Sequence, residues 1–182
     1  MKASAELIDN LRISRPIPAR PPGYKPMYVD LEKIYKTYFN GQDLRSGDLY
    51  KNECAIRMSL ALSLNGFSFD RFPDKSRLKI GGRTGILVPH VYGAYELAAY
   101  LKKEWGPPIS FRGKAKEIAQ GIISGKRGVL YFNNCSGTGD HIDLWNGAEF
   151  YNQILGVSAH VGYSSKRNLF YKSDTIWFWE VR

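Results

Sequence analysis

Apolar residues recur every three or four positions in the first two thirds of the chain and follow a strand-like pattern in the last third. The segments with helical spacing are residues 28–39, 52–66, 95–105 and 114–124. The segments typical of strands are residues 129–132, 142–145 and 176–181, the last strongly aromatic and expected near the centre of a sheet. Because helices come first and strands follow, the pattern predicts an α+β fold with an antiparallel sheet.

The N-terminal region differs in composition from the rest of the chain. Five prolines lie between residues 13 and 26, and this density excludes a helix and favours extended surface chain. We therefore expect a Pro-rich N-terminal extension, residues 1–27, and a single domain, residues 28–182. The first residues contain no uninterrupted apolar run, and no segment approaches the ~20 apolar residues of a membrane span. We expect neither a signal peptide nor membrane insertion.

Charge and composition narrow the classes of partner. The formal net charge of +9 suits an anionic partner such as an acidic cell-wall polymer. The sequence has no dense Lys/Arg block, zinc-finger spacing or RNA-binding aromatic motif, so we expect no nucleic-acid partner. The glycine-rich segment 81–85 lacks the lysine of a phosphate-binding loop. We also expect no metal ion and no cofactor.

The segment 52–66 carries the first candidate for chemistry. Its apolar residues cover more than one face, so it is expected to be a buried helix, with Asn52 as its cap and Gly66 as its stop. Cys54 falls in the first turn, where free backbone N–H groups and the helix dipole favour a thiolate. Cys54 is therefore a candidate nucleophile; the alternative is a small core residue.

A cysteine nucleophile needs a base, and the chain contains His90, His141 and His160. His141 begins a strand that runs into Asn146-Gly147, a dipeptide typical of a two-residue hairpin turn. A two-residue loop would pair Trp145 with Ala148 and place His141 opposite position 152.

Position 152 is an asparagine, and directly paired side chains have Cβ atoms ~5 Å apart. Asn152 is thus the first candidate to orient the imidazole, and Asp143, on the same strand face as His141, is the second. The backbone N–H of Cys54 is a natural oxyanion donor, and Asn52 is a candidate for a second. This sequence of roles, thiolate then base then orienting group, is that of papain.

Two motifs carry a family resemblance. Residues 52–59, Asn-Glu-Cys-Ala-Ile-Arg-Met-Ser, resemble the nucleophile motif of type VI secretion amidase effectors of the fourth family, and residues 140–147, Asp-His-Ile-Asp-Leu-Trp-Asn-Gly, resemble their histidine motif. The helix at 95–101 and the tail at 176–179 also fit, and the resemblance spans residues 28–182.

The resemblance implies a papain-like cysteine amidase, with the catalytic helix packed against the sheet. It implies cleavage of the bond between γ-D-glutamate and meso-diaminopimelate in peptidoglycan stem peptides. It further implies export from the cytoplasm by the type VI secretion apparatus, action in the periplasm of the target cell, and a cognate immunity protein that plugs the active site.

The chain departs from the family pattern at two positions. Asp140 stands where glycine usually precedes the histidine, and it would either raise the pKa of the imidazole or face solvent. The third residue is commonly an acid, whereas Asn152 would orient the ring without charge. Two other functions stay open: a non-catalytic basic module that binds an acidic polymer, and another papain-like acyl transferase.

Two further features have both a functional and a structural interpretation. Cys135 lies in a glycine-containing loop before His141. It is either an ordinary loop thiol or the partner of Cys54 in a regulatory disulfide. Trp177 and Trp179 on the last strand are expected in the core, with sugar stacking as the alternative.

Overall fold

The computed structural model describes residues 20–38, 53–80, 88–135, 139–150 and 166–182. Its helices are α2 (Tyr28–Tyr38), α3 (Glu53–Leu64), α4 (Ala94–Trp105), α5 (Ala115–Ile122) and α7 (Lys166–Lys172). Its strands are β1 (Leu78–Lys79), β2 (His90–Val91), β3 (Ile109–Arg112), β4 (Gly128–Asn133), β5 (His141–Trp145) and β6 (Thr175–Glu180). All four helices predicted from the sequence are present, within one or two residues of their expected ends.

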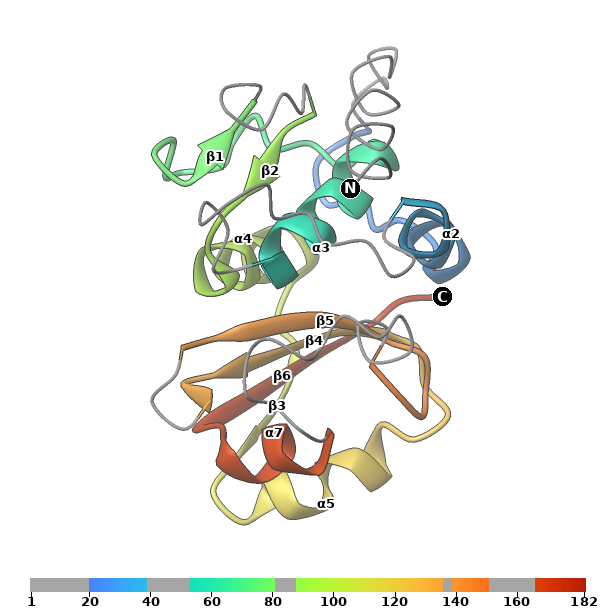
Figure 1. Cartoon of the computed structure of the whole chain (residues 1–182), viewed down its shortest axis with the longest axis vertical. Coiled ribbons are helices and arrows are strands. Elements are labelled where there is room, and N and C mark those ends of the chain that lie inside the picture. The colour runs from blue at the N-terminus through green and yellow to red at the C-terminus, as the bar shows by residue number, and fades with distance from the viewer. Residues whose placement is uncertain (1–19, 39–52, 81–87, 136–138, 151–165) are drawn as a thin grey trace, which may run out of the picture.

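A four-stranded antiparallel sheet divides the molecule into layers. The strand order is β3-β6-β4-β5, so the aromatic strand β6 is central, as its composition predicts. Helices α2, α3 and α4 lie on one face and α5 and α7 on the other (Figure 1). Each face has its own apolar core: we call the core beneath α2–α4 the first core and the core beneath α5 and α7 the second core.

Helix α3 is the most enclosed element. Every side chain from residue 55 to residue 62 is at most 1% exposed, and the helix packs against α2, α4, β2 and β5. Helix α3 ends at Leu64, and the predicted stop, Gly66, follows with a φ of +83° that glycine adopts readily. The Ser59 hydroxyl donates to Ala55 O at 2.7 Å and accepts from Val91 N at 2.8 Å, so the helix also holds β2 in place.

The turn after β5 differs from the predicted two-residue hairpin. Trp145 pairs with Phe150 instead of Ala148, and Asn146 N donates to Glu149 O at 3.1 Å, which closes a four-residue turn. The Asn146 side chain explains the difference, because its Oδ1 accepts from the backbone N–H groups of Ala148 and Glu149. Gly147 has a positive φ of +100°, whereas Asn146 does not, so a type I′ turn is excluded.

Three features were not predicted from the sequence. Strand β3 is an edge strand in which only Phe111 is buried, so it lacks a clear alternation of apolar and polar residues. Helix α7 has seven residues, too few for a periodic signal. The small β1-β2 ribbon has two residues in each strand. No helix among the described residues is long and apolar enough to span a membrane.

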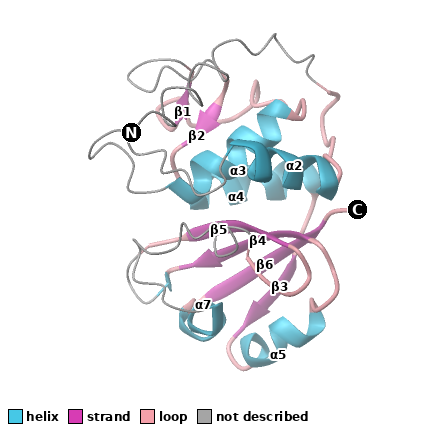
Figure 2. Cartoon of the chain, turned by 45° about the vertical axis from the view of Figure 1, so that its right-hand side comes forward, coloured by secondary structure: helices cyan, strands magenta, loops and turns pink. Residues whose placement is uncertain are grey.

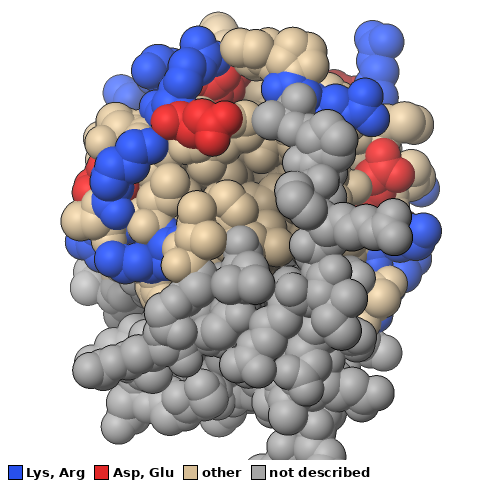
Figure 3. Space-filling view, turned by 90° about the horizontal axis from the view of Figure 1, so that it is seen from above, with Lys and Arg blue, Asp and Glu red and all other residues tan. Residues whose placement is uncertain are grey.

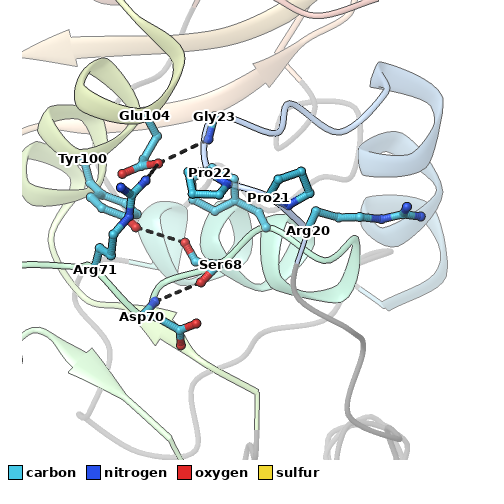
Figure 4. A pocket seen from close by; sticks show the side chains of 10 residues that line it. Arg20, Pro21, Pro22, Gly23, Ser68, Asp70, Arg71, Tyr100 and Glu104 are labelled. Atoms are coloured by element: carbon cyan, nitrogen blue, oxygen red, sulfur yellow. Dashed lines mark hydrogen bonds and ion pairs between the residues drawn. The ribbon is translucent and has the colours of Figure 1, made fainter.

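Residues 20–27 of the Pro-rich region pack against the domain. Arg20 N donates to Gly66 O at 2.9 Å, and the Trp105 indole donates to Tyr24 O at 2.9 Å. Figure 4 shows the pocket of about 170 Å³ that this segment encloses with α4 and the chain after α3. Its wall holds an ion pair between Arg71 and Glu104 at 2.6 Å, and Gly23 N donates to the same carboxylate. The division of the chain at residue 27 stays a prediction.

The contact between β4 and β6 provides a test of the sheet. A Cβ added to Gly128 would overlap the main-chain oxygen of Trp179 and come within 2.8 Å of the Phe178 ring. We expect Gly128→Ala to lower the free energy of unfolding by about 3 kcal/mol, measured by urea denaturation. The matched control is Gly121→Ala in α5, where an added Cβ meets no atom within 4 Å. There we expect a change of about +0.5 to +1 kcal/mol. Equal effects of the two substitutions would contradict this packing.

Candidate active site

Cys54 lies at the N-terminus of the buried helix. It is the second residue of α3, is half-buried, and packs against the first core. The first backbone N–H groups of a helix have no acceptor within the helix and stabilise negative charge. The thiol of Cys54 is therefore placed beside the free N–H groups of the first turn, and its side chain is only half-buried.

His141 is the first residue of β5, and its imidazole is 14% exposed. Its Cα faces that of Phe132 on β4, and the imidazole lies 6.4 Å from the Phe132 ring and 6.5 Å from the Phe150 ring. Both phenylalanines belong to the second core. The imidazole is thus held by aromatic packing from the side of the sheet opposite α3.

Asp143 is two residues further along β5 and is completely buried. Its Oδ2 is 3.7 Å from His141 Nε2, and its Oδ1 accepts a hydrogen bond from Leu144 N at 2.8 Å. The period of two along a strand places both side chains on one face, as predicted. Because Nε2 faces the carboxylate, Nδ1 is the ring nitrogen left for another partner.

The electrostatics of His141 connect these three side chains. Burial alone would lower the pKa of His141, but the thiolate form of Cys54, a side-chain hydrogen bond with Cys54 and the Asp143 carboxylate together raise it to about 10. A protonated imidazole at neutral pH beside a thiolate is the ion pair that cysteine hydrolases use. The structure thus brings Cys54, His141 and Asp143 into one group.

The position of β5 brings these side chains near each other. Among the described strands β5 is the last in the sheet order, and a single bridge joins Trp145 at its end to Phe150. α3 packs directly on β5, on the first-core side (Figure 2). His141 is the first residue of β5 and Cys54 lies in the first turn of α3, so the packing of α3 on β5 brings the two side chains near each other.

The sequence profile of a known family matches residues 50–179, and its description is "Type VI secretion system (T6SS), amidase effector protein 4", or Tae4. The matched residues include Cys54, His141 and Asp143. The chain belongs to this family. A search of the curated proteins finds no match.

Solved structures support the fold. The effector Tae4 from Salmonella typhimurium, in complex with the immunity protein Tai4 from Enterobacter cloacae, aligns with a TM-score of 0.62 and 18% identity over 87% of this chain and 100% of that one. Tae4 from Enterobacter cloacae in complex with Tai4 aligns with a TM-score of 0.60 and 18% identity, with the same coverage of both chains. Enterobacter cloacae Tae4 aligns with a TM-score of 0.57 and 20% identity over 87% of this chain and 98% of its own. The predicted papain-like α+β fold, with α3 packed against the sheet, is confirmed.

Asp140, the residue before His141, supports the loop before β5. Its carboxylate accepts hydrogen bonds from the Tyr131 hydroxyl at 2.8 Å, Asn134 N at 2.7 Å and Asn133 Nδ2 at 3.3 Å. The carboxylate, which is half-buried, thus ties the end of β4 to the start of β5, a role not considered from the sequence.

Cys135 is a core residue. Its side chain is completely buried in the second core, and its thiol lies 3.7 Å from Phe132 O. Cys54 packs against the first core, on the other side of the sheet, and neither cysteine is in a disulfide. This arrangement gives no support to the regulatory disulfide considered from the sequence.

Two of the predicted site residues, Asn52 and Asn152, lie outside the described residues, so the oxyanion role of the first and the orienting role of the second stay predictions. Among the described residues, no group of three or more His, Cys, Asp and Glu side chains could hold a metal ion. Trp179 is 2% exposed, and Trp177 packs beside the first core with the Lys102 ammonium 4.9 Å from its ring centre. The core interpretation of these tryptophans is thus confirmed for Trp179.

The analysis of the sequence missed two buried polar residues near Cys54, namely Arg57 in α3 and Tyr35 in α2, both 0% exposed. A signal was present for Arg57, because an arginine in the middle of a helix that is apolar on several faces has to be buried.

The raised pKa of His141 predicts a dependence of stability on pH. The pKa of about 10 in the folded protein exceeds the ordinary value of 6.5, so the folded state binds the proton more tightly than the unfolded chain. The resulting stabilisation is complete below pH 6.5 and is lost as pH rises toward 10. We expect Cys54→Ala to lower the pKa of His141, read from the ring resonances by NMR, and to flatten this loss in denaturation series. An unchanged His141 titration in Cys54→Ala would contradict the contact.

Proposed function

We propose that this effector is a cysteine hydrolase that cleaves the bond between γ-D-glutamate and meso-diaminopimelate in peptidoglycan stem peptides. Cys54 is the nucleophile, His141 is the base, and Asp143 orients and charges the imidazole. The observation that carries the proposal is the contact of a helix-start thiol with an imidazole whose other nitrogen faces a buried carboxylate. Membership of an amidase effector family supports the reaction class.

The residues divide the reaction into two steps. The Cys54 thiolate attacks the amide carbon, and the resulting oxyanion accepts a hydrogen bond from the backbone N–H of Cys54. The His141 imidazolium gives its proton to the leaving amine of diaminopimelate, the C–N bond breaks, and a thioester remains. His141 then takes a proton from water, the hydroxide adds to the thioester, and the carboxylate and the free thiol are released.

Asp143 is proposed as the third member because it is charged and adjacent. A buried carboxylate 3.7 Å from Nε2 stabilises the imidazolium and directs Nδ1 toward the thiol. A neutral asparagine such as Asn152 could orient the ring but would contribute no charge. Asp143 therefore replaces Asn152 as the first candidate, and Asn152 is kept as a second support for the same ring.

The charge of the protein fits an acidic substrate. Stem peptides carry several carboxylates, and the chain has 26 Lys and Arg against 17 Asp and Glu. On the face shown in Figure 3, the basic side chains are spread around the described part of the surface and form no single block. Spread charge attracts an anionic polymer without defining a groove for nucleic acid.

The biological setting follows from the family. Related effectors from Salmonella typhimurium and Enterobacter cloacae are solved in complex with immunity proteins. We infer that this effector also has a cognate immunity protein, which protects the producing cell. We further infer that it is delivered by the type VI apparatus and acts in the periplasm of the target cell.

Digestion of purified muropeptides tests the reaction. We expect the native protein to produce fragments that are heavier by one water in total, with a new D-glutamate carboxylate and a new diaminopimelate amine, identified by mass spectrometry. Cys54→Ala should lose at least about a thousandfold in rate, because the nucleophile is removed. Intact stem peptides with the native protein would overturn the substrate, and equal digestion by both proteins would overturn the nucleophile. Transfer of the acyl group to an added amine would indicate an acyl transferase.

The orienting residue is tested by two matched substitutions. We expect Asp143→Asn to lower kcat by about a hundredfold or more with little change in KM, since the imidazolium loses its charged partner. We expect Asn152→Ala to lose less than Asp143→Asn. If the order were reversed in steady-state rates on one muropeptide, Asn152 would be the third member and Asp143 a structural residue.

A further inference from the structure

Residues 20–27, which we call the N-terminal strap, lie outside residues 50–179, the part of the chain that matches the family profile. The strap has no helix or strand of its own. Fixing each residue of such a segment costs about 1–2 kcal/mol of backbone conformational entropy, so contacts with the rest of the molecule have to offset that cost. These contacts therefore indicate which parts of the fold the strap connects.

The strap begins with a tight turn that its own sequence favours. Tyr24 N donates to Pro21 O at 3.1 Å, and Gly23 has a positive φ of +79°. Proline at the second position and glycine at the third position are typical of a type II turn, and Pro22 and Gly23 occupy these positions. Because proline fixes its own φ, the unfolded strap has fewer conformations to lose, and the turn costs less free energy to order.

The backbone is bonded at both ends of the strap. Arg20 N donates to Gly66 O at 2.9 Å, two residues after the end of α3. Tyr28, directly after the strap, donates through its N–H to Arg182 O at 2.6 Å, two residues after the end of β6. Pro26, near this second end, is buried. The strap thus spans from the end of α3 to the end of β6.

Glu104 attaches the middle of the strap to α4. Its side chain is only 5% exposed although it lies in the last turn of α4, where the free carbonyl groups make a negative charge unfavourable. Two donors compensate the carboxylate, namely Arg71 Nη2 at 2.6 Å, from the chain after α3, and Gly23 N at 3.3 Å, from the strap (Figure 4). A single buried carboxylate therefore joins three separate segments.

Trp105, the last residue of α4, makes the second attachment. Its indole N–H donates to Tyr24 O at 2.9 Å, and the Lys25 ammonium lies 5.5 Å from the ring centre. The same ring packs edge-on against Phe67 at 5.7 Å and against Trp179 of β6 at 6.5 Å. Phe67 follows α3, so the strap, the ends of α3 and α4, and the sheet meet at this ring.

We propose that the N-terminal strap is a structural clamp that holds the C-terminal ends of α3 and α4 together and closes that end of the first core as one cooperative unit. The folded unit then begins at or before residue 20, and not at residue 28 as the composition predicts. This inference goes beyond the proposed function and is independent of it, because the clamp acts at the end of α3 opposite to Cys54.

Hydrogen exchange of the full chain, measured by mass spectrometry, tests whether the strap is held. We expect the peptide that covers residues 20–28 to exchange at least about a hundredfold more slowly than the same sequence in an unfolded chain, because four of its amides are bonded. These are the amides of Arg20, Gly23, Tyr24 and Tyr28. Exchange at the rate of an unfolded chain would overturn the proposal.

Two glutamates of α4 provide a matched comparison. Glu104→Ala removes the acceptor of Gly23 N, whereas Glu96 lies in the first turn and pairs with Arg77 at 3.5 Å. We expect Glu104→Ala to lower Tm by about 4 °C or more and to speed the exchange of the strap about tenfold. Glu96→Ala should change Tm by less than about 2 °C and leave the exchange of the strap unchanged.

The helix dipole alone predicts the opposite order for these two variants, because a negative charge stabilises the first turn of a helix and destabilises the last. Glu104→Ala also removes the ion pair with Arg71, so the exchange of the strap is the deciding measurement. Unchanged exchange of the strap in Glu104→Ala would overturn the proposal, whatever the change of Tm.

A substitution of Trp105 tests whether the clamp acts as a unit. Trp105→Phe keeps an aromatic ring beside Phe67 and removes the N–H that donates to Tyr24 O. We expect exchange to rise about fivefold or more in the strap and also in residues 62–68, at the end of α3. The matched control is Trp177→Phe on β6, where the half-buried ring lies beside Lys102; it should leave both segments unchanged.

A rise confined to the strap in Trp105→Phe would mean that the strap only lies on α4, and it would overturn the clamp. If Trp105→Phe does not fold, the exchange of residues 62–68 in Glu104→Ala decides the question in the same way. None of these measurements needs a substrate, so an inactive native protein would overturn the proposed function and leave the clamp standing.

Discussion

A helix enclosed on every side has to present one reactive side chain to solvent, and the rest of this structure is arranged around that constraint. From residue 55 to residue 62, α3 has no exposed side chain, so it is fixed by its neighbours over more than two turns. Only its two ends are partly accessible, and Cys54 occupies the first turn. The helix is therefore held rigidly along its buried length and is accessible to solvent at its first turn. The helix dipole favours negative charge at that same end.

The position of β5 in the sheet determines how the thiol of Cys54 and the imidazole of His141 come together. A thiol from the first core has to meet an imidazole packed against Phe132 and Phe150 of the second core. The imidazole belongs to the first residue of β5, the outermost of the described strands, and α3 packs on that strand. That strand also carries Asp143, so the base and its carboxylate keep a spacing set by the strand period, whatever the surrounding loops do.

Much of this arrangement follows from the sequence, and the failures have physical reasons. Helix α3 and the aromatic strand β6 depend on the local pattern of apolar residues and were predicted. The sequence also indicated Cys54 as the candidate nucleophile and His141 as its candidate base. The prediction of a two-residue turn at Asn146-Gly147 was wrong. Asparagine can adopt a positive φ, but its side-chain oxygen can equally well accept hydrogen bonds from the backbone N–H groups that follow it, and Asn146 does the latter. The preference for Asn152 depended on that turn, and Asp143 was ranked second because a neighbour on the same strand looked too distant to orient the ring. The burial of Asp143, 3.7 Å from His141 Nε2, is the observation that makes it the first candidate, and the sequence pattern does not quantify burial for a single carboxylate.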